Sequence, residues 1–265
     1  MYSNKVIAFV DILGFKSLIS RSEKEEAIAE SLLNVLTSLL PEQIQEESSF
    51  QINYDRIPKE QVEEVEKLAK LFSKGVFGQC DIKISYFSDC IVLSAPAEDE
   101  MSCFMIFEYL AKLMVRVFEE YNLLLRGGIS MGKLYHEQAG PLFGPAMVDA
   151  YEIESKLAIY PRILLEKNTF RGVKSTERNT YMLPLFSEKN GEGYITLASA
   201  YQYLATSSTM ATIPNFLDQL INGYTSSLSK SIELAEKFKG SKHEDKYEWA
   251  LNEMRSIEDE MKSLG

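Results

Sequence analysis

Two aspartates in this sequence follow or interrupt apolar runs, in positions that suit metal chemistry. Asp11 ends the run "KVIAFVD", and Asp89 lies in "YFSDCIVLSA", between two short apolar segments. If these segments are neighbouring strands, the two carboxylates lie close together and disfavour mutual ionisation unless a cation sits between them. Carboxylate oxygens are ligands that suit Mg²⁺ or Mn²⁺. Asp11 and Asp89 are therefore candidate ligands of a divalent ion.

The turn that follows Asp11 has the features of an anion site. The backbone N–H groups of Ile12, Leu13, Gly14 and Phe15 lie at the start of a predicted helix. The helix dipole favours an anion there, and glycine permits a close approach. Metal ions beside such a turn are the equipment for nucleoside triphosphate chemistry, in which one ion activates an attacking hydroxyl and the other neutralises the leaving pyrophosphate.

Each candidate also has an ordinary structural interpretation. Asp11 can cap a helix and Asp89 can stabilise a turn. Arg126, in the strand-like stretch "LLLRGGISMGKLY", is costly to bury without a partner, so it serves either base or phosphate recognition or a structural ion pair. Tyr86 either narrows a base pocket against purines or packs in the core.

Weaker candidates surround this set. Lys16, Lys133 and Lys174 are possible triphosphate contacts, although most surface lysines bind nothing. Glu152 and Glu154 have helical spacing, which is typical of a solvated helix face.

The elements that must position these residues alternate between strands and helices. The predicted strands are 4–12, 82–86, 90–93, 123–138, 161–168, 179–186 and 193–197, and the predicted helices are 23–40, 100–122 and 144–159. The order of strand, helix, hairpin, helix, strand, helix and strand predicts an α+β ferredoxin-like sandwich, in which the first strand lies beside the hairpin. The glycines of the fourth strand would weaken it unless something approaches its backbone closely.

Two segments fall outside this sandwich. Residues 41–80 read as an insertion with one charged helix, and residues 213–240 and 241–265 as two helices of a C-terminal hairpin. We therefore expect a domain over 1–200 and a helical extension over 201–265. An apolar stripe of Trp249, Leu251 and Met254 predicts that this extension packs on the domain or on a second copy of it.

Composition limits the function. The chain has 265 residues, 45% hydrophobic, and a formal net charge of -11, which argues against a broad duplex nucleic-acid surface. The cysteines Cys80, Cys90 and Cys103 form no paired framework, so we expect reduced thiols and a cytoplasmic protein. His136 and His243 have no neighbouring ligand cluster, which argues against zinc. We expect neither a signal peptide nor a membrane span.

Four of these stretches together resemble the class III nucleotidyl cyclases. "FVDILGFKSL" is similar to the first metal motif of that family, and "YFSDCIVLSA" to its metal hairpin, with Ser88 where glycine is usual. "LLRGGISMGKLY" and "GPLFGPAMVDAYEIES" resemble the Arg-containing strand and the turn and helix that follow it. Their order and spacing hold from residue 5 to about 166. The resemblance implies metal ligation by Asp11, Asp89 and the backbone carbonyl of Ile12.

The sequence departs from the usual cyclases in two places. Val148 and Glu152 occupy the positions where the family carries a transition-state Asn and Arg, and Ser85 and Pro141 occupy the positions that select a purine. The chain therefore carries neither purine code.

With Trp249 and the C-terminal helices, these departures resemble the pyrimidine cyclases of the bacterial Pycsar anti-phage systems. The resemblance implies a homodimer with two composite sites and two ions, Mg²⁺ or Mn²⁺, at each. It implies conversion of UTP or CTP to a 3′,5′-cyclic monophosphate that activates a separate effector. UTP is favoured weakly, because an Arg126 donor would suit the uracil carbonyl. The alternative is a non-catalytic nucleotide-binding or scaffolding module on the same fold.

Overall fold

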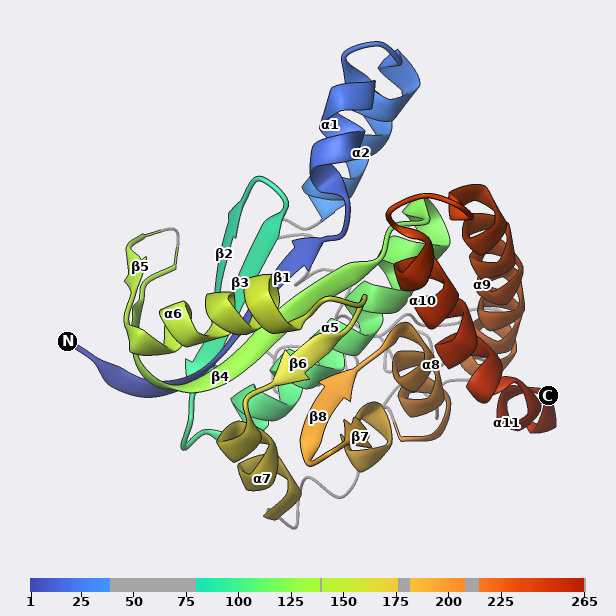
Figure 1. Ribbon diagram of the computed structural model, residues 1–265. Coiled ribbons are helices and arrows are strands. Elements are labelled where there is room, and N and C mark those ends of the chain that lie inside the picture. The colour runs from blue at the N-terminus through green and yellow to red at the C-terminus, as the bar shows by residue number, and fades with distance from the viewer. Residues whose placement is uncertain (39–79, 139, 176–181, 208–214, 265) are drawn as a thin grey trace, which may run out of the picture.

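The computed structural model describes residues 1–38, 80–138, 140–175, 182–207 and 215–264, which form an eight-stranded mixed sheet packed with helices (Figure 1). In sheet order the strands are β2 (Lys83–Phe87), β3 (Cys90–Pro96), β1 (Ser3–Ile12), β4 (Leu125–His136), β6 (Ile163–Leu165), β8 (Glu192–Ile195) and β7 (Ser187–Lys189). A further short strand, β5 (Leu142–Phe143), pairs with β4. Only the β4–β6 pair among these is parallel.

The order β2-β3-β1-β4 confirms the α+β ferredoxin-like arrangement. β1 lies between β3 and β4 and is buried from Lys5 to Val10, which explains why its sequence is continuously apolar. Its register places Asp11 opposite Cys90 on one side and opposite Arg126 on the other. Three segments far apart in the sequence therefore meet at one end of the sheet.

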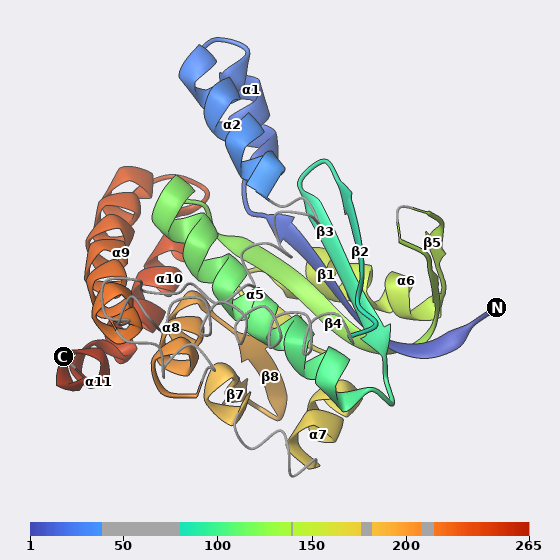
Figure 2. The same cartoon turned by 180° about the vertical axis from the view of Figure 1, so that it is seen from behind.

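The described helices cover both faces of the sheet and one of its ends. They are α1 (Phe15–Ser22), α2 (Glu26–Ser38), α5 (Glu100–Tyr121), α6 (Pro145–Glu152), α7 (Lys167–Ser175), α8 (Leu197–Thr206), α9 (Phe216–Phe238), α10 (Glu244–Ser256) and α11 (Glu258–Ser263). α5 packs on one face and forms the main core with β1, β3 and β4, whereas α6 packs on the opposite face (Figures 1 and 2). The α1–α2 pair projects away from the sheet beyond the end of β1.

The glycines of β4 are explained by the helix that crosses them. A Cβ atom on Gly128 would lie 2.2 Å from the carbonyl oxygen of Ala150, at the end of α6. The expectation of a close backbone approach is therefore confirmed. α6 continues directly into a π-helical turn, η3 (Ile153–Leu157), which contacts β4 and β6. The predicted helix over 144–159 thus changes its winding at residue 153.

The C-terminal helices share the core of the sheet. Met254 is fully buried in the main core, and Trp249 packs with the smaller cluster that includes Tyr194 and Ile153. The hydroxyl of Tyr224 on α9 donates to the carbonyl oxygen of Met254 on α10 at 2.7 Å, so the two helices are joined to each other as well. α8 spans the boundary expected at residue 200, and buried residues on both sides of it belong to one core.

Two predictions about elements have other outcomes. The predicted strand over 179–186 is wrong in its described part, because residues 182–185 form a short 3₁₀ turn. The helical insertion predicted over 41–80 lies outside the described residues except for Cys80. Within the described part of the chain, we find no helix with the length and apolarity that crossing a membrane requires.

Candidate metal and nucleotide site

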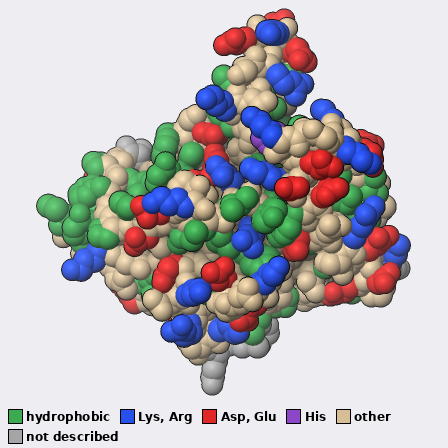
Figure 3. Space-filling model, viewed as in Figure 1, with side chains coloured by type: hydrophobic (Ala, Val, Ile, Leu, Met, Phe, Trp, Pro, Cys, Tyr) green, Lys and Arg blue, Asp and Glu red, His purple; other side chains and the backbone are tan. Residues whose placement is uncertain are grey.

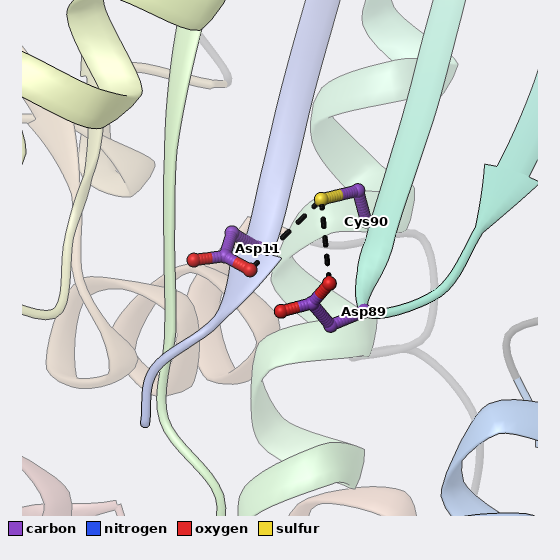
Figure 4. A group of neighbouring side chains, drawn as sticks. All are labelled: Asp11, Asp89 and Cys90. Atoms are coloured by element: carbon purple, nitrogen blue, oxygen red, sulfur yellow. Dashed lines mark hydrogen bonds between the residues drawn. The ribbon is translucent and has the colours of Figure 1, made fainter. Parts of the chain in front are cut away.

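The two aspartates converge as their positions at the strand ends predict. Asp11 is the second-last residue of β1. Asp89 lies in the two-residue turn between β2 and β3, beside Ser88, whose φ is +56°. Figure 4 shows both carboxylates directed toward the thiol of Cys90. The ligand atoms of the three side chains lie within 4.8 Å of one another, so a single ion could reach all of them.

The electrostatics of this group favour a bound cation. Burial, followed by the hydrogen bond and negative charge of Asp89, raises the pKa of Asp11 to about 7, although Arg126 opposes the shift. A cation between the two carboxylates removes the cause of this repulsion. Burial and the same carboxylates raise the pKa of the Cys90 thiol to about 12, so the thiol stays protonated at neutral pH. The available donors are therefore oxygens, which fit Mg²⁺ or Mn²⁺ better than a thiophilic ion.

Arg126 lies at the centre of an ion-pair network. Its Nε and Nη2 atoms donate to Oδ2 of Asp11 at 3.2 and 3.1 Å, and Nη2 lies 2.6 Å from Oε1 of Glu154. Of the two roles considered for Arg126, the structural ion pair is thus present. Because one acceptor is a candidate metal ligand, the guanidinium lies directly against the candidate metal site.

Glu154 belongs to the site, contrary to the expectation of a solvated face. Its side chain is 4% exposed, because the π-helical turn brings it in against β4. Glu152 does lie on the exposed side of the helix, where it pairs with Lys156 at 2.8 Å. The i→i+5 hydrogen bonding of a π-helical turn changes which side chain faces inward, and such turns are frequent at functional sites.

In the turn after Asp11, two backbone N–H groups form hydrogen bonds within the fold and two have no backbone acceptor among the described residues. The N–H of Ile12 donates to the carbonyl of Asp89 at 3.3 Å, and that of Leu13 to the carbonyl of Leu124 at 2.8 Å. These two N–H groups are therefore already bonded within the fold, which leaves Gly14 and Phe15 as the better candidates for an anion contact. Gly14, with φ of +84°, precedes α1, and neither its N–H nor that of Phe15 has a backbone acceptor within the described residues.

Ser85 and Pro141 both relate to the end of β4, Ser85 through a contact with His136 and Pro141 through the connection to β5. The Ser85 hydroxyl is 2.9 Å from Nε2 of His136, and Nδ1 of His136 is 2.8 Å from the Ser94 hydroxyl. Pro141 follows in the same β4–β5 connection and accepts from the N–H of Glu137 at 3.1 Å. Burial lowers the pKa of His136 to about 4, with further contributions from Lys5 and Lys83, so the ring is neutral.

Tyr86 lies on the opposite face of the sheet from Asp11. Because side chains alternate along a strand, the flanking residues Ser85 and Phe87 point to the same face of the sheet as Asp11. Tyr86 points to the other face and packs against the main core under α5. Of its two interpretations, the structure supports core packing rather than a base contact.

The lysines proposed as triphosphate contacts are dispersed. Lys16 is at the start of α1, close in sequence to the turn after Asp11. Lys133 is towards the far end of β4, opposite Asn4. Lys174 pairs with Glu188 at 2.6 Å on another part of the molecule. Of the three, only Lys16 belongs to the helix that begins at the Gly14 turn.

Sequence reasoning missed Cys90, Glu154 and two basic residues of α10, His243 and Lys246, discussed below. Cys90 had a usable signal, because it is the residue after Asp89 in a strand that must pair with β1. Glu154 had none, since ordinary helical spacing directs it to solvent.

The fold is thus an α+β sheet that brings two carboxylates to a turn with free backbone donors. No protein-family model matches the chain, and no curated protein matches it. Among solved structures it is similar to the adenylyl cyclase CyaB from P. aeruginosa, with a TM-score of 0.44, 15% identity, and coverage of 66% of this chain and 82% of that one. It is also similar to a bacterial light-regulated adenylyl cyclase, with a TM-score of 0.40, 13% identity, and coverage of 84% and 98%.

Proposed function

We propose that this chain is a divalent-metal-dependent nucleotidyl cyclase that converts a pyrimidine nucleoside triphosphate to its 3′,5′-cyclic monophosphate and pyrophosphate. The observation that carries the proposal is the convergence of Asp11 and Asp89 beside the Gly14 turn, in the order in which the class III cyclases carry their metal motifs. Both carboxylates are only partly buried, so an ion could reach them.

The roles of the residues follow from their positions. Asp11, Asp89 and the carbonyl of Ile12 would hold two Mg²⁺ or Mn²⁺ ions, which lower the pKa of the attacking 3′ hydroxyl and neutralise the leaving pyrophosphate. The N–H groups of Gly14 and Phe15 would bind phosphate oxygens at the positive end of α1. Arg126 would add a charged donor at the same place.

A pyrimidine substrate is the finer part of the proposal. It rests on the absence of a purine code at Ser85 and Pro141. The argument for UTP over CTP through Arg126 is weakened, because its guanidinium lies on Asp11 and Glu154 and is better placed for phosphate than for a base. UTP remains the first substrate to test, and CTP the second.

The active form is proposed to be a homodimer with composite sites. Exposed apolar side chains gather over β5, β2 and α6 (Figure 3). Phe87, Val148 and Tyr151 are each more than half exposed, at 51%, 56% and 51%, on the same side of the sheet as Asp11. Large apolar patches on a soluble surface mark interaction sites, and this one borders the carboxylates.

In the cell, the product would be a second messenger in anti-phage defence, sensed by a separate effector, and the enzyme would work in the cytoplasm. These points rest on the resemblance to the Pycsar cyclases. Neither nucleic acid nor membrane is proposed as a partner.

A specific observation favours the alternative of a non-catalytic nucleotide-binding module. The positions of the usual transition-state Asn and Arg hold an exposed valine, Val148, and a glutamate, Glu152, already paired with Lys156. Neither side chain supplies positive charge to a transition state.

One experiment separates the two functions. The purified chain is incubated with each of ATP, GTP, CTP and UTP in the presence of Mn²⁺, and the products are identified by mass spectrometry. A cyclic pyrimidine monophosphate, lost in Asp89→Asn, supports the proposal. A cyclic purine product keeps the enzyme class and overturns the pyrimidine assignment. Nucleotide-dependent thermal stabilisation without product supports the non-catalytic module.

A further inference from the structure

The connection between α9 and α10 approaches the turn that follows Asp11, although the two are more than 200 residues apart in the sequence. A pocket of about 100 Å³ lies between them. Gly14, Ser17 and Arg21 line it from the start of α1, and His243 and Lys246 line it from the start of α10. The C-terminal extension therefore forms one wall of a cavity whose other wall is the proposed phosphate turn.

The wall from the C-terminal extension brings a lysine and a histidine to the pocket. Within the described residues Lys246 makes no ion pair, and burial followed by the positive charge of Arg126 lowers the pKa of Lys246. Burial, Lys242 and Lys246 similarly lower the pKa of His243. In a chain of net charge -11, Lys and Arg side chains nevertheless gather around the base of the α1–α2 projection (Figure 3). An anion would relieve this local repulsion.

The same wall is held in place by its own contacts. Phe238 stacks on Tyr247 with ring centroids 4.1 Å apart, and His243 meets the edge of Phe238 at 6.3 Å. Gly240 adopts φ of +72°, and its N–H donates to Oε2 of Glu244 at 2.8 Å. The basic side chains are thus presented by an ordered turn, which reduces the entropy lost on binding.

The pocket has room for a small anion. Its volume of about 100 Å³ is several times the ~10–15 Å³ that one ordered water requires. The lining offers a hydroxyl from Ser17 and cationic donors from Lys246 and from Arg21, whose Nε lies 3.6 Å from Oε1 of Glu25. Such groups are the usual partners of phosphate oxygens.

We infer that this pocket is a phosphate-binding subsite, and that Lys246, with His243 beside it, binds a phosphate group that also contacts the Gly14 turn. The phosphate belongs either to the end of a nucleoside triphosphate or to free pyrophosphate. The first source rests on the proposed function, and the second does not. In either case the C-terminal extension is a part of the binding site.

The test uses the full chain with inorganic pyrophosphate and no metal, by isothermal titration calorimetry. Lys246→Gln is expected to weaken binding about tenfold, as the loss of one charge-assisted hydrogen bond does. His243→Asn is a second variant, because asparagine keeps a favoured residue at the helix N-cap. Lys242→Gln is the matched control, since it removes the same charge from the same turn but does not line the pocket. Circular dichroism and unfolding of each variant without ligand establish that it is folded.

The outcomes separate the subsite from the proposed activity. Equal pyrophosphate affinity in the wild type and Lys246→Gln, or an equal loss in Lys242→Gln, overturns the inference. Lys246-dependent pyrophosphate binding supports it, whether or not a cyclic nucleotide is ever formed. If the chain is an active cyclase, a raised KM for UTP in Lys246→Gln assigns the subsite to the substrate. An unchanged KM with weakened pyrophosphate binding assigns it to the free anion.

Discussion

The carboxylate of Asp11 contacts an arginine on one side and belongs to a candidate metal site on the other. Its carboxylate accepts two bonds from Arg126 and faces a second carboxylate within reach of one ion. Removal of either carboxylate leaves too few oxygen ligands, but the consequences differ. Asp11→Asn also breaks an ion pair, whereas Asp89→Asn removes only a turn residue with no ion pair in the described structure.

Asp89→Asn should therefore weaken Mn²⁺ binding by more than about tenfold, the range found when groups around a metal are removed. Electron paramagnetic resonance of free Mn²⁺ measures this directly, without an assay of turnover. Asp218→Asn, at an exposed position in the first turn of α9, is the matched control. An unchanged Mn²⁺ affinity in Asp89→Asn would contradict the metal assignment.

His136 makes the stability of the fold depend on pH. The ring is buried between Ser85 and Ser94, and burial lowers the pKa of His136 from 6.5 to about 4. The folded state therefore resists protonation while the unfolded state accepts it, so stability is full above pH 6.5 and falls as the pH drops toward 4. Between pH 7 and pH 5 this residue alone should cost about 2 kcal/mol of unfolding free energy.

Urea unfolding at a series of pH values measures this loss. The carboxylates also titrate in this range, so the informative quantity is the difference between the wild type and His136→Asn. That difference should shrink as the pH falls from 7 to 5, because the variant lacks the titrating group. Parallel curves would contradict the assignment of the buried neutral ring.

The sequence predicts those site residues whose position is set by the end of a strand. The proximity of Asp11 and Asp89 was predictable, because each lies at the end of a strand that ferredoxin-like topology makes adjacent to the other. The burial of Glu154 was not predictable, because it depends on a π-helical turn that residue spacing does not indicate. The positions of Lys246 and His243 were not predictable either, because they depend on how a distant helical hairpin packs on the sheet.

At the scale of elements, the crossing of α6 over β4 positions both Glu154 and, through it, Arg126. The helix approaches closest at Gly128, where an added Cβ would meet the Ala150 carbonyl at 2.2 Å. At Gly132, four residues along the same strand, the nearest atom would be the Cβ of Ala146 at an ordinary 3.5 Å. The two glycines thus provide a matched comparison within one strand.

Gly128→Ala is expected to destabilise the fold by about 2 kcal/mol or more, as overpacking of a rigid contact does. Gly132→Ala should be close to neutral, because a strand tolerates alanine where space allows. Chemical denaturation of both variants checks the difference. Similar stabilities would mean that α6 does not rest on the backbone of β4 as described.

Elements were predicted well where a strong pattern met a clear boundary. The first strand, the hairpin and the long apolar helix of α5 all have continuous or periodic apolar residues that end at polar turns. The stretch 179–186 misled because "YMLPLF" is apolar enough for a strand, yet Pro184 has no N–H for a sheet ladder and suits the observed turn at 182–185.

At the scale of the whole molecule, the exposed apolar side of the sheet predicts self-association. Val148→Arg places a charge in the middle of the patch over α6, where Val148 is 56% exposed, and should shift the dimer toward monomer. Light scattering after size-exclusion chromatography measures the mass across a range of concentrations. Ile232→Arg, at an exposed apolar position on α9, is the control and should leave the mass unchanged. A wild-type monomer at high concentration would contradict the proposed assembly.

The central position of β1 has a consequence for how the chain acquires its structure. Its partners are residues 90–96 and 125–134, so none of its ladder hydrogen bonds can form from neighbouring sequence. Contacts of such long range must overcome a large loop-closure entropy, and they slow folding. During synthesis, residues 3–12 therefore cannot pair with both neighbouring strands until more than a hundred further residues have been added. The pairing of β1 with β3 and β4 is also what brings Asp11, Cys90 and Arg126 together, so the candidate site depends on the same long-range contacts as the centre of the sheet.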